Sequence, residues 1–335
     1  MTGPASDPSL PELLATLRAF AIPMQTKFRG ITVRAGALIQ GPAGWGEFSP
    51  FAEYGPAESA RWLASAIESA TVAWPSPLRS SVPVNVTVPA VDPGRAHEIV
   101  AASGCRTAKV KVAERGQREH EDLERVAAVR DALDAAGPGG RIRVDANGGW
   151  SVEQAARLLR RLSRYGLEYA EQPCASLDEL TRLRQLVDVP IAADESIRKA
   201  DDPLKVRAAG AADIVMVKVQ PLGGVRAALR VAEACGLPVV VSSAVDTSVG
   251  LAAGVALAAA LPSLPYACGL ATMSLLDGDV TAAPLAESGG SLPVRRPEVD
   301  LAALAQWEID PAPWRARALA AAECLASASG EPSRG

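Results

Sequence analysis

From residue 82 onward the chain alternates between short apolar runs and amphipathic stretches. Near-continuous apolar runs are typical of strands buried on both faces, and apolar positions at helical spacing predict the helices between them. Strands are expected to begin at residues 82, 107, 141, 167, 190, 213, 238 and 267. Eight strands in succession favour a closed TIM-like barrel of the (β/α)7β or (β/α)8 type over an open sheet.

The segments on either side of this alternation follow other patterns. Residues 19–54 read as strands, with a turn predicted at Ala35 and Gly36, and Pro56 begins a helical pattern. We therefore predict a separate α+β lobe at 1–81 and a barrel at 82–275. Residues 276–335 are expected to return toward the first lobe, with a disordered tail from about residue 326.

Lysines are placed where two of the predicted strands reach the barrel rim. Lys109 and Lys111 alternate with apolar residues, so a strand projects both from the same face. Lys218 ends the sixth strand, which lies opposite the second in a ring of eight. The pattern predicts lysines facing each other across the barrel, where a neutral amine can act as a base. For Lys109 or Lys111 alone, a solvated charge at a strand end is the alternative.

Three carboxylates end the third, fourth and fifth predicted strands: Asp145, Glu171 and Asp194. Converging carboxylates repel one another unless a cation lies among them. A site made only of oxygen ligands suits Mg²⁺, with Mn²⁺ as a substitute. Each acid alone is explained equally well as a helix cap or an arginine partner. Three at matching strand ends favour a metal site.

Two further segments carry polar groups suited to a substrate carboxylate. Ser242 and Ser243 place hydroxyls and backbone N–H groups ahead of a predicted helix, and Gly223 permits close backbone approach. Neither serine has an evident histidine partner, so a nucleophilic serine is not expected.

Composition narrows the class of protein. The 335 residues carry a net charge of −4 and no strongly basic stretch, which argues against nucleic acid as a partner. The longest apolar run is too short to span a bilayer, so no membrane partner is expected. The five cysteines are scattered and read as reduced thiols in a cytoplasmic protein. We expect a small-molecule carboxylate substrate and a monomer or small homo-oligomer.

Taken in order, the motifs resemble those of the enolase superfamily, in the subgroup with lysines on both sides of the barrel. Within it they are most similar to the actinobacterial form of the o-succinylbenzoate synthase family. The resemblance covers roughly residues 19–315 and implies an enolase-type barrel with a capping domain formed by the N-terminal segment and the C-terminal tail. It rests on these motifs: FRGITVR (28–34), GWGEFSPF (44–51), KVK (109–111), RVDAN (143–147), EQP (171–173), ADES (193–196), VKVQPLGG (217–224) and VVVSSAVDTSVGL (239–251).

The resemblance implies a Mg²⁺-dependent lyase, a hydro-lyase of menaquinone biosynthesis. Its reaction is the syn dehydration of 2-succinyl-6-hydroxy-2,4-cyclohexadiene-1-carboxylate to 2-succinylbenzoate through a metal-stabilised enolate. By position it implies Lys111 and Lys218 as catalytic residues and Asp145, Glu171 and Asp194 as metal ligands. It implies substrate contacts from these residues: Lys109, Asn147, Ser242, Ser243 and Gly223.

Two departures from the family pattern bear on the substrate. Gln172 stands where relatives often carry an acid, which leaves the three metal ligands intact, and the link from Phe20 to Phe28 is short. Because dehydration and racemisation both begin with abstraction of an alpha proton, an N-acylamino acid racemase or dipeptide epimerase is the alternative function. A non-catalytic ligand-binding barrel is the second alternative.

Overall fold

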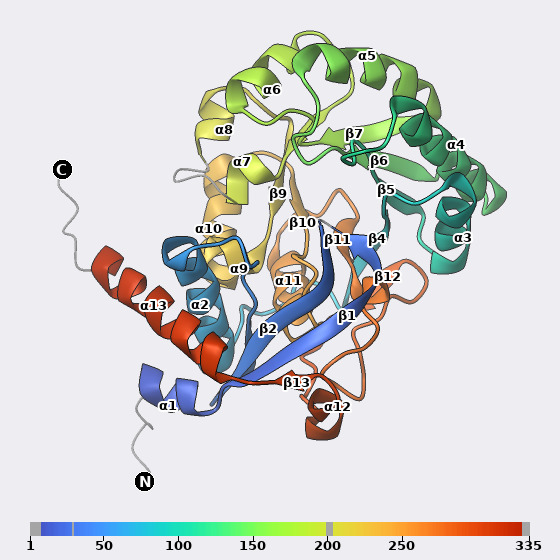
Figure 1. The fold of residues 1–335 in the computed structure, drawn as a ribbon. Helices are drawn as coiled ribbons and strands as arrows, with labels where there is room; N and C mark the ends of the chain where they lie inside the picture. The colour runs from blue at the N-terminus through green and yellow to red at the C-terminus, as the bar shows by residue number, and fades with distance from the viewer. Residues whose placement is uncertain (1–7, 29, 199–203, 330–335) are drawn as a thin grey trace.

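The computed structural model describes residues 8–28, 30–198 and 204–329, which form a barrel and a smaller capping lobe (Figure 1). The capping lobe is built on a four-stranded antiparallel sheet of order β13-β1-β2-β3. Its elements are α1 (Leu10–Ala15), β1 (Arg18–Phe28), β2 (Ile31–Gly41), β3 (Gly44–Phe48), α2 (Pro56–Thr71), β13 (Glu308–Ile309) and α13 (Ala312–Ser329).

The C-terminal segment joins this lobe from a great distance in sequence. Strand β13 pairs with β1, and α13 lies beside α2, as the red and blue helices of Figure 1 show. Aromatic rings fill the core between them, with Phe48 edge-on to Trp314. Helix α13 continues through Ser329, so residues 326–329 are helical rather than disordered as predicted; the last six residues lie outside the described ranges.

The predicted barrel is confirmed. Eight parallel strands follow one another in the order of the chain, except that the last, β11, pairs with the first, β4. A bridge between Ser242 and Gly269 links β10 to β11 and closes the ring. The strands are β4 (Ser81–Val88), β5 (Thr107–Lys111), β6 (Arg141–Asp145), β7 (Leu167–Glu171), β8 (Ile191–Ala193), β9 (Ile214–Val217), β10 (Val239–Val241) and β11 (Cys268–Ala271).

Helices cover the outside of the strands, and their apolar faces form one continuous core with them (Figure 1). No α-helix directly follows β11; a single 3₁₀ turn, η2 (Met273–Leu275), stands there, so the barrel is of the (β/α)7β type. The helices are α3 (Pro93–Ser103), α4 (Glu119–Ala135), α5 (Val152–Leu162) with the 3₁₀ turn η1 (Ser163–Tyr165), α6 (Leu177–Arg184), α7 (Glu195–Arg198), α8 (Lys205–Ala208), α9 (Val219–Leu222), α10 (Val225–Cys235) and α11 (Ser248–Ala260).

The return segment after η2 does not go directly to the capping lobe. Strand β12 (Ser291–Pro293) pairs antiparallel with β4, at the start of the barrel's first strand, before α12 (Leu301–Ala305) leads on to β13. Pairing with β12 supplies hydrogen-bond partners to a part of β4 that extends beyond its parallel neighbours. None of the described helices combines the length and apolarity that a membrane crossing requires.

Candidate active site

Strand register brings the predicted residues together at one end of the barrel. In the parallel pair of β5 and β6, Lys111 stands beside Asp145; in the next pair, Asp145 stands beside Glu171. Asp194 and Lys218 are the first residues after β8 and β9. Because the carboxyl ends of parallel strands meet at one rim, charged residues at five successive strand ends converge there.

Lys109 lies deepest among these residues. Its Nζ atom is 3.3 Å from Asp145 Oδ2 and 3.1 Å from both carboxylate oxygens of Glu171. Burial alone would lower the pKa of Lys109, but Glu171 and Asp145 outweigh burial and raise that pKa above its usual value. Lys109 is therefore held as a cation between two carboxylates.

Lys111 occupies the same strand one pleat nearer the rim. Its ammonium donates to Asp145 Oδ2 at 2.5 Å and to Asn147 Oδ1 at 2.7 Å, and it lies 5.1 Å from the centre of the Phe28 ring. Asn147 has a left-handed backbone with φ of 47°. This turn directs the Asn147 amide back toward the lysine, so the RVDAN segment orients Lys111 from two positions.

Lys218 approaches from the opposite side of the barrel. Its Nζ atom contacts both oxygens of Asp194, at 2.6 and 2.5 Å. Three strands separate β9 from β5 in either direction around the ring, yet Lys218 and Lys111 line the same pocket. The structure thus brings together the lysines that the sequence predicts on opposite sides.

We call the cavity lined by Lys109, Lys111 and Lys218 the lysine pocket. Most of the predicted site residues line it, but Gly223 does not: it ends α9 with φ of 92° and faces the α2 backbone at Arg61. Glu171 does not line it either, although both of its carboxylate oxygens contact Lys109, which does. The lining residues are Phe28, Thr87, Lys109, Lys111, Asp145, Asn147, Asp194, Lys218, Ser242, Ser243, Ala244, Val245, Gly269 and Thr272.

Several lining residues are not predicted from the sequence. Phe28 comes from the capping lobe, where β1 continues to the pocket, and only its place in the FRGITVR motif marks it. Thr87 comes from the first barrel strand, and Thr272 is the residue directly after the last one. Thr87 occupies the inward-facing position next to Lys109 in the register of β4 and β5, a signal that strand alternation alone could supply.

The serines differ in part from their predicted role. The N–H groups of Ser242 and Ser243 bond to the carbonyls of Val217 and Gly269, which closes the barrel. They are therefore not available as a carboxylate cradle. The Ser243 hydroxyl lies 2.8 Å from that of Thr272, so hydroxyls remain the polar groups that this side of the pocket offers.

The carboxylates are not electrostatically equivalent. Burial would raise the pKa of Asp145, yet Lys111 and Lys109 hold it well below its ordinary value. Burial and the neighbouring Asp145 charge raise the pKa of Glu171 to about 7, even though Lys109 is in contact. Glu171 therefore keeps its proton to a higher pH than Asp145 does.

The donor set fits a hard divalent cation. Asp145, Glu171 and Asp194 supply only oxygen ligands from the ends of neighbouring strands, and such ligands suit Mg²⁺. Within the described residues, no group of three acidic, histidine or cysteine side chains is already arranged around a common point. Lys109 and Lys218 hold the acids instead, so that their ammonium groups stand where a cation's charge is needed.

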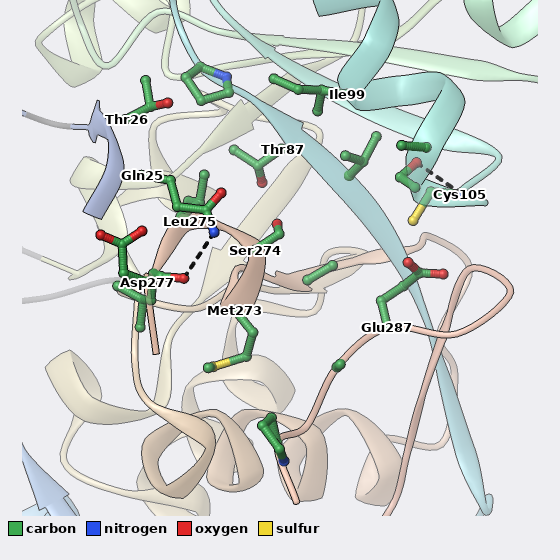
Figure 2. A pocket seen from close by; sticks show the side chains of 18 of the residues that line it. Gln25, Thr26, Thr87, Ile99, Cys105, Met273, Ser274, Leu275, Asp277 and Glu287 are labelled. Carbon is green, nitrogen blue, oxygen red and sulfur yellow. Dashed lines mark hydrogen bonds between the residues drawn. The ribbon is translucent and has the colours of Figure 1, made fainter. Parts of the chain in front are cut away.

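A larger cavity adjoins the lysine pocket. The lysine pocket has about 20 Å³ of free volume, the adjoining cavity has about 510 Å³, and Thr87 lines both. In Figure 2, Gln25, Thr87 and Leu275 lie at one end of this cavity, whereas Cys105 and Glu287 lie at the other. Its size is that of a site for a small organic molecule.

Comparison with known proteins gives the family. Residues 94–298 match the model of the enolase C-terminal domain-like family, and residues 19–70 match that of the enolase N-terminal domain-like family. A protein of Thermobifida fusca named o-succinylbenzoate synthase is 66% identical over 317 residues, which cover 95% of this chain and 99% of the relative. This chain belongs to the o-succinylbenzoate synthase family of the enolase superfamily.

Other members of the o-succinylbenzoate synthase family are also similar over nearly their whole length. The o-succinylbenzoate synthase of Mycolicibacterium smegmatis is 53% identical, with 90% of this chain and 96% of the relative covered. Among solved structures, muconate lactonizing enzyme from Pseudomonas fluorescens superimposes with a TM-score of 0.75 at 22% identity, covering 88% of this chain and 98% of that one. At that identity the likeness concerns the fold alone.

Proposed function

We propose that this protein is an o-succinylbenzoate synthase. It would catalyse the syn dehydration of 2-succinyl-6-hydroxy-2,4-cyclohexadiene-1-carboxylate to 2-succinylbenzoate, a hydro-lyase step of menaquinone biosynthesis. The observation that carries the proposal is the lysine pocket itself: Lys111 and Lys218 face one space beside three carboxylates, in a chain 66% identical to a protein of that name.

Lys111 is the acid/base in this proposal. Its neutral amine removes the proton from the carbon that bears the carboxylate and then returns a proton to the departing hydroxyl, which leaves as water. In a syn elimination both groups depart from one face of the ring, so one residue on one strand suffices. The contact of Lys111 with Asn147 supports this role, because it orients the amine toward the pocket.

Lys218 serves as the opposing cation. It lies 5% exposed beside Asp194, where its charge stabilises negative charge that develops on the substrate during proton removal. Whether it also accepts a proton depends on the substrate face presented to it. Lys109 contacts both Asp145 and Glu171. It therefore holds these two carboxylates in place beside the strand that carries Lys111.

Asp145, Glu171 and Asp194 would hold Mg²⁺, or Mn²⁺ as a substitute. When bound, such a cation supplies Lewis-acid stabilisation to the substrate carboxylate and to the enolate derived from it. The carboxylate oxygens of the three acids, at the ends of neighbouring strands, are the ligands that such a cation prefers.

The remaining assignments follow from the same reading. A small-molecule carboxylate is the partner, and the protein acts as a monomer or small homo-oligomer in the cytoplasm. Racemisation is not favoured, because curated relatives 66% and 53% identical to this chain are named o-succinylbenzoate synthase.

An ultraviolet assay tests the proposal directly, because dehydration converts a cyclohexadiene into an aromatic ring. With Mg²⁺ present we expect turnover of the hydroxycyclohexadiene carboxylate. The racemase alternative would appear as deuterium exchange at the alpha carbon of N-acylamino acids. Exchange without any dehydration would reject the synthase assignment.

A further inference from the structure

Glu47 links the two lobes beside the lysine pocket, although it does not line that pocket. It stands near the end of β3 in the capping lobe and is 2% exposed. Its Oε2 atom accepts hydrogen bonds from Thr247 Oγ1 at 2.5 Å, from Thr247 N at 3.1 Å and from Gly250 N at 3.0 Å. A carboxylate of one lobe therefore caps a helix of the other.

That helix is α11, which follows directly on a wall of the lysine pocket. Thr247 is its N-cap residue, and residues 242–245 immediately before it line the pocket. The first N–H groups of a helix have no partner within the helix and carry partial positive charge. Glu47 satisfies two of these groups and so fixes where α11 begins.

Arg34 holds the same wall from a second position. Its Nε atom donates to Val245 O at 2.9 Å, while its guanidinium also donates to Ser49 O at 2.6 Å and Ser49 Oγ at 2.7 Å. Val245 has φ of 62°, a conformation that β-branched residues rarely adopt. Such a backbone persists only where its surroundings hold it.

The network also reaches the loop that carries Lys218. Gln220 lies two residues further on; its Nε2 donates to Asp246 Oδ1 at 2.6 Å and to Ser49 Oγ at 3.2 Å. Ser49 Oγ in turn donates to Glu47 Oε1 at 2.6 Å. One buried set of contacts thus connects β3, the Lys218 loop and the pocket wall.

The side chains of this network pack tightly against Gly250 of α11. A Cβ atom on Gly250 would lie 2.8 Å from Glu47 Oε2 and 2.9 Å from Gln220 Nε2. Both distances are shorter than Cβ contacts allow. Glycine at the first turn of α11 is what permits the carboxylate to approach the helix so closely.

We propose that Glu47 is a positioning residue for the dehydration. From the capping lobe it caps α11, and it thereby fixes the position of residues 242–245 relative to Lys111 and Lys218. This inference rests on the proposed function, and it assigns the capping lobe a part in the geometry of the lysine pocket. Glu47 acts through Thr247, Gly250 and Ser49 rather than by touching substrate.

A role limited to holding the lobes together is the competing explanation, and the chain offers a matched control. Glu68 on α2 is a second carboxylate that bridges the lobes: it accepts from Arg226 N at 3.2 Å and from Arg226 Nη1 at 2.9 Å. Arg226 lies in the first turn of α10, and neither residue lines the lysine pocket.

The test compares Glu47→Ala, Glu47→Gln and Glu68→Ala in the full-length enzyme. For Glu47→Ala we expect kcat to fall by at least about tenfold, because small displacements in an active site have effects of this size or larger. Amide hydrogen exchange should also rise in residues 242–250. Glu47→Gln keeps an acceptor for the helix and should remain within about threefold of the parent enzyme in kcat. Glu68→Ala should lower the melting temperature without either change.

Equal kcat values for Glu47→Ala and Glu68→Ala, with unchanged exchange in 242–250, would overturn the proposal. If Glu47→Ala does not fold, Thr247→Val removes the hydroxyl donor to Glu47 and is expected to produce the same two effects. Hydrogen exchange needs no substrate. An enzyme without dehydratase activity would therefore refute the proposed function, while the exchange data would still decide whether Glu47 holds the pocket wall.

Discussion

Lys218 contacts both carboxylate oxygens of Asp194, at 2.6 and 2.5 Å, in the wall of a pocket that Lys111 lines from the other side. The two side chains are almost completely buried. Breaking a buried ion pair leaves an uncompensated charge, which is costly. Asp194 therefore needs a positive charge beside it, and Lys218 supplies that charge here.

Asp194→Asn should weaken metal binding. The substitution removes a full negative charge from the proposed ligand set, and we expect Mg²⁺ affinity to fall by at least about tenfold. Isothermal titration with Mg²⁺ measures this directly. Asp213→Asn is the control, because Asp213 pairs with Arg184 just before β9, at the opposite end of that strand from Lys218. Undiminished affinity in Asp194→Asn would count against the ligand set.

Lys111→Ala should abolish turnover while leaving the metal bound. Removal of a general acid/base costs on the order of 10²- to 10⁴-fold in rate. Here one amine would serve both proton transfers, so we expect the upper part of that range in the ultraviolet assay. Lys205→Ala, on α8 outside the lysine pocket, should retain the parent rate. Full activity of Lys111→Ala would show that another residue is the base.

The barrel and the meeting of its charged strand ends could be predicted because both follow from short-range rules. Side-chain alternation puts Lys109 and Lys111 on one face, and parallel strands bring Asp145, Glu171 and Asp194 to one rim. Which residues contact one another within that rim could not be predicted. The binding of Glu171 by Lys109 rather than Lys111 depends on depth in the barrel, which the pattern does not encode.

The sequence pattern misplaces a turn at Ala35 and Gly36 and does not identify Phe28 as a pocket residue, and both differences have physical causes. Ala35 and Gly36 were predicted as a turn, but β2 runs straight through them. Gly36 is needed there because a Cβ would lie 2.6 Å from both the Phe20 ring and Ser49 Cβ. Glycine marks a close approach here, and local sequence does not distinguish that from a turn. Phe28 was missed for a related reason, since its place in the pocket depends on how the two lobes pack.

The stability difference between Glu47→Gln and the parent enzyme should depend on pH. Burial and the nearby Asp246 raise the pKa of Glu47 from 4.5 to about 7, although Arg34 opposes them. The folded protein therefore binds the proton more tightly than the unfolded chain, so the carboxyl's stabilising contribution is complete below pH 4.5 and is lost as pH rises through 7. Glutamine does not titrate. Relative to the parent, the variant should gain about 3 kcal/mol in free energy of unfolding between pH 4.5 and 8.

Urea unfolding of both proteins at several pH values tests this expectation, and the difference between the two curves cancels the shared groups that do not interact with Glu47. The gain should be confined to the range from about pH 4.5 to 8. A constant offset across that range would mean that the pKa of Glu47 is the same in the folded and unfolded states.

Gly46→Ala should destabilise the capping lobe. Gly46 lies in β3 against α2, where a Cβ would stand 2.0 Å from Ala66 O and 2.8 Å from Ala66 C. Helix backbone cannot yield as a flexible side chain does, so the strand must move away from α2. Overpacking of this kind costs about 1–3 kcal/mol. Gly55→Ala is the matched control, because a Cβ there meets nothing within 4 Å and only the smaller cost of replacing the N-cap residue of α2 is expected. Urea unfolding should show a larger loss in Gly46→Ala than in Gly55→Ala; equal stability of the two variants would mean that β3 and α2 have room to separate.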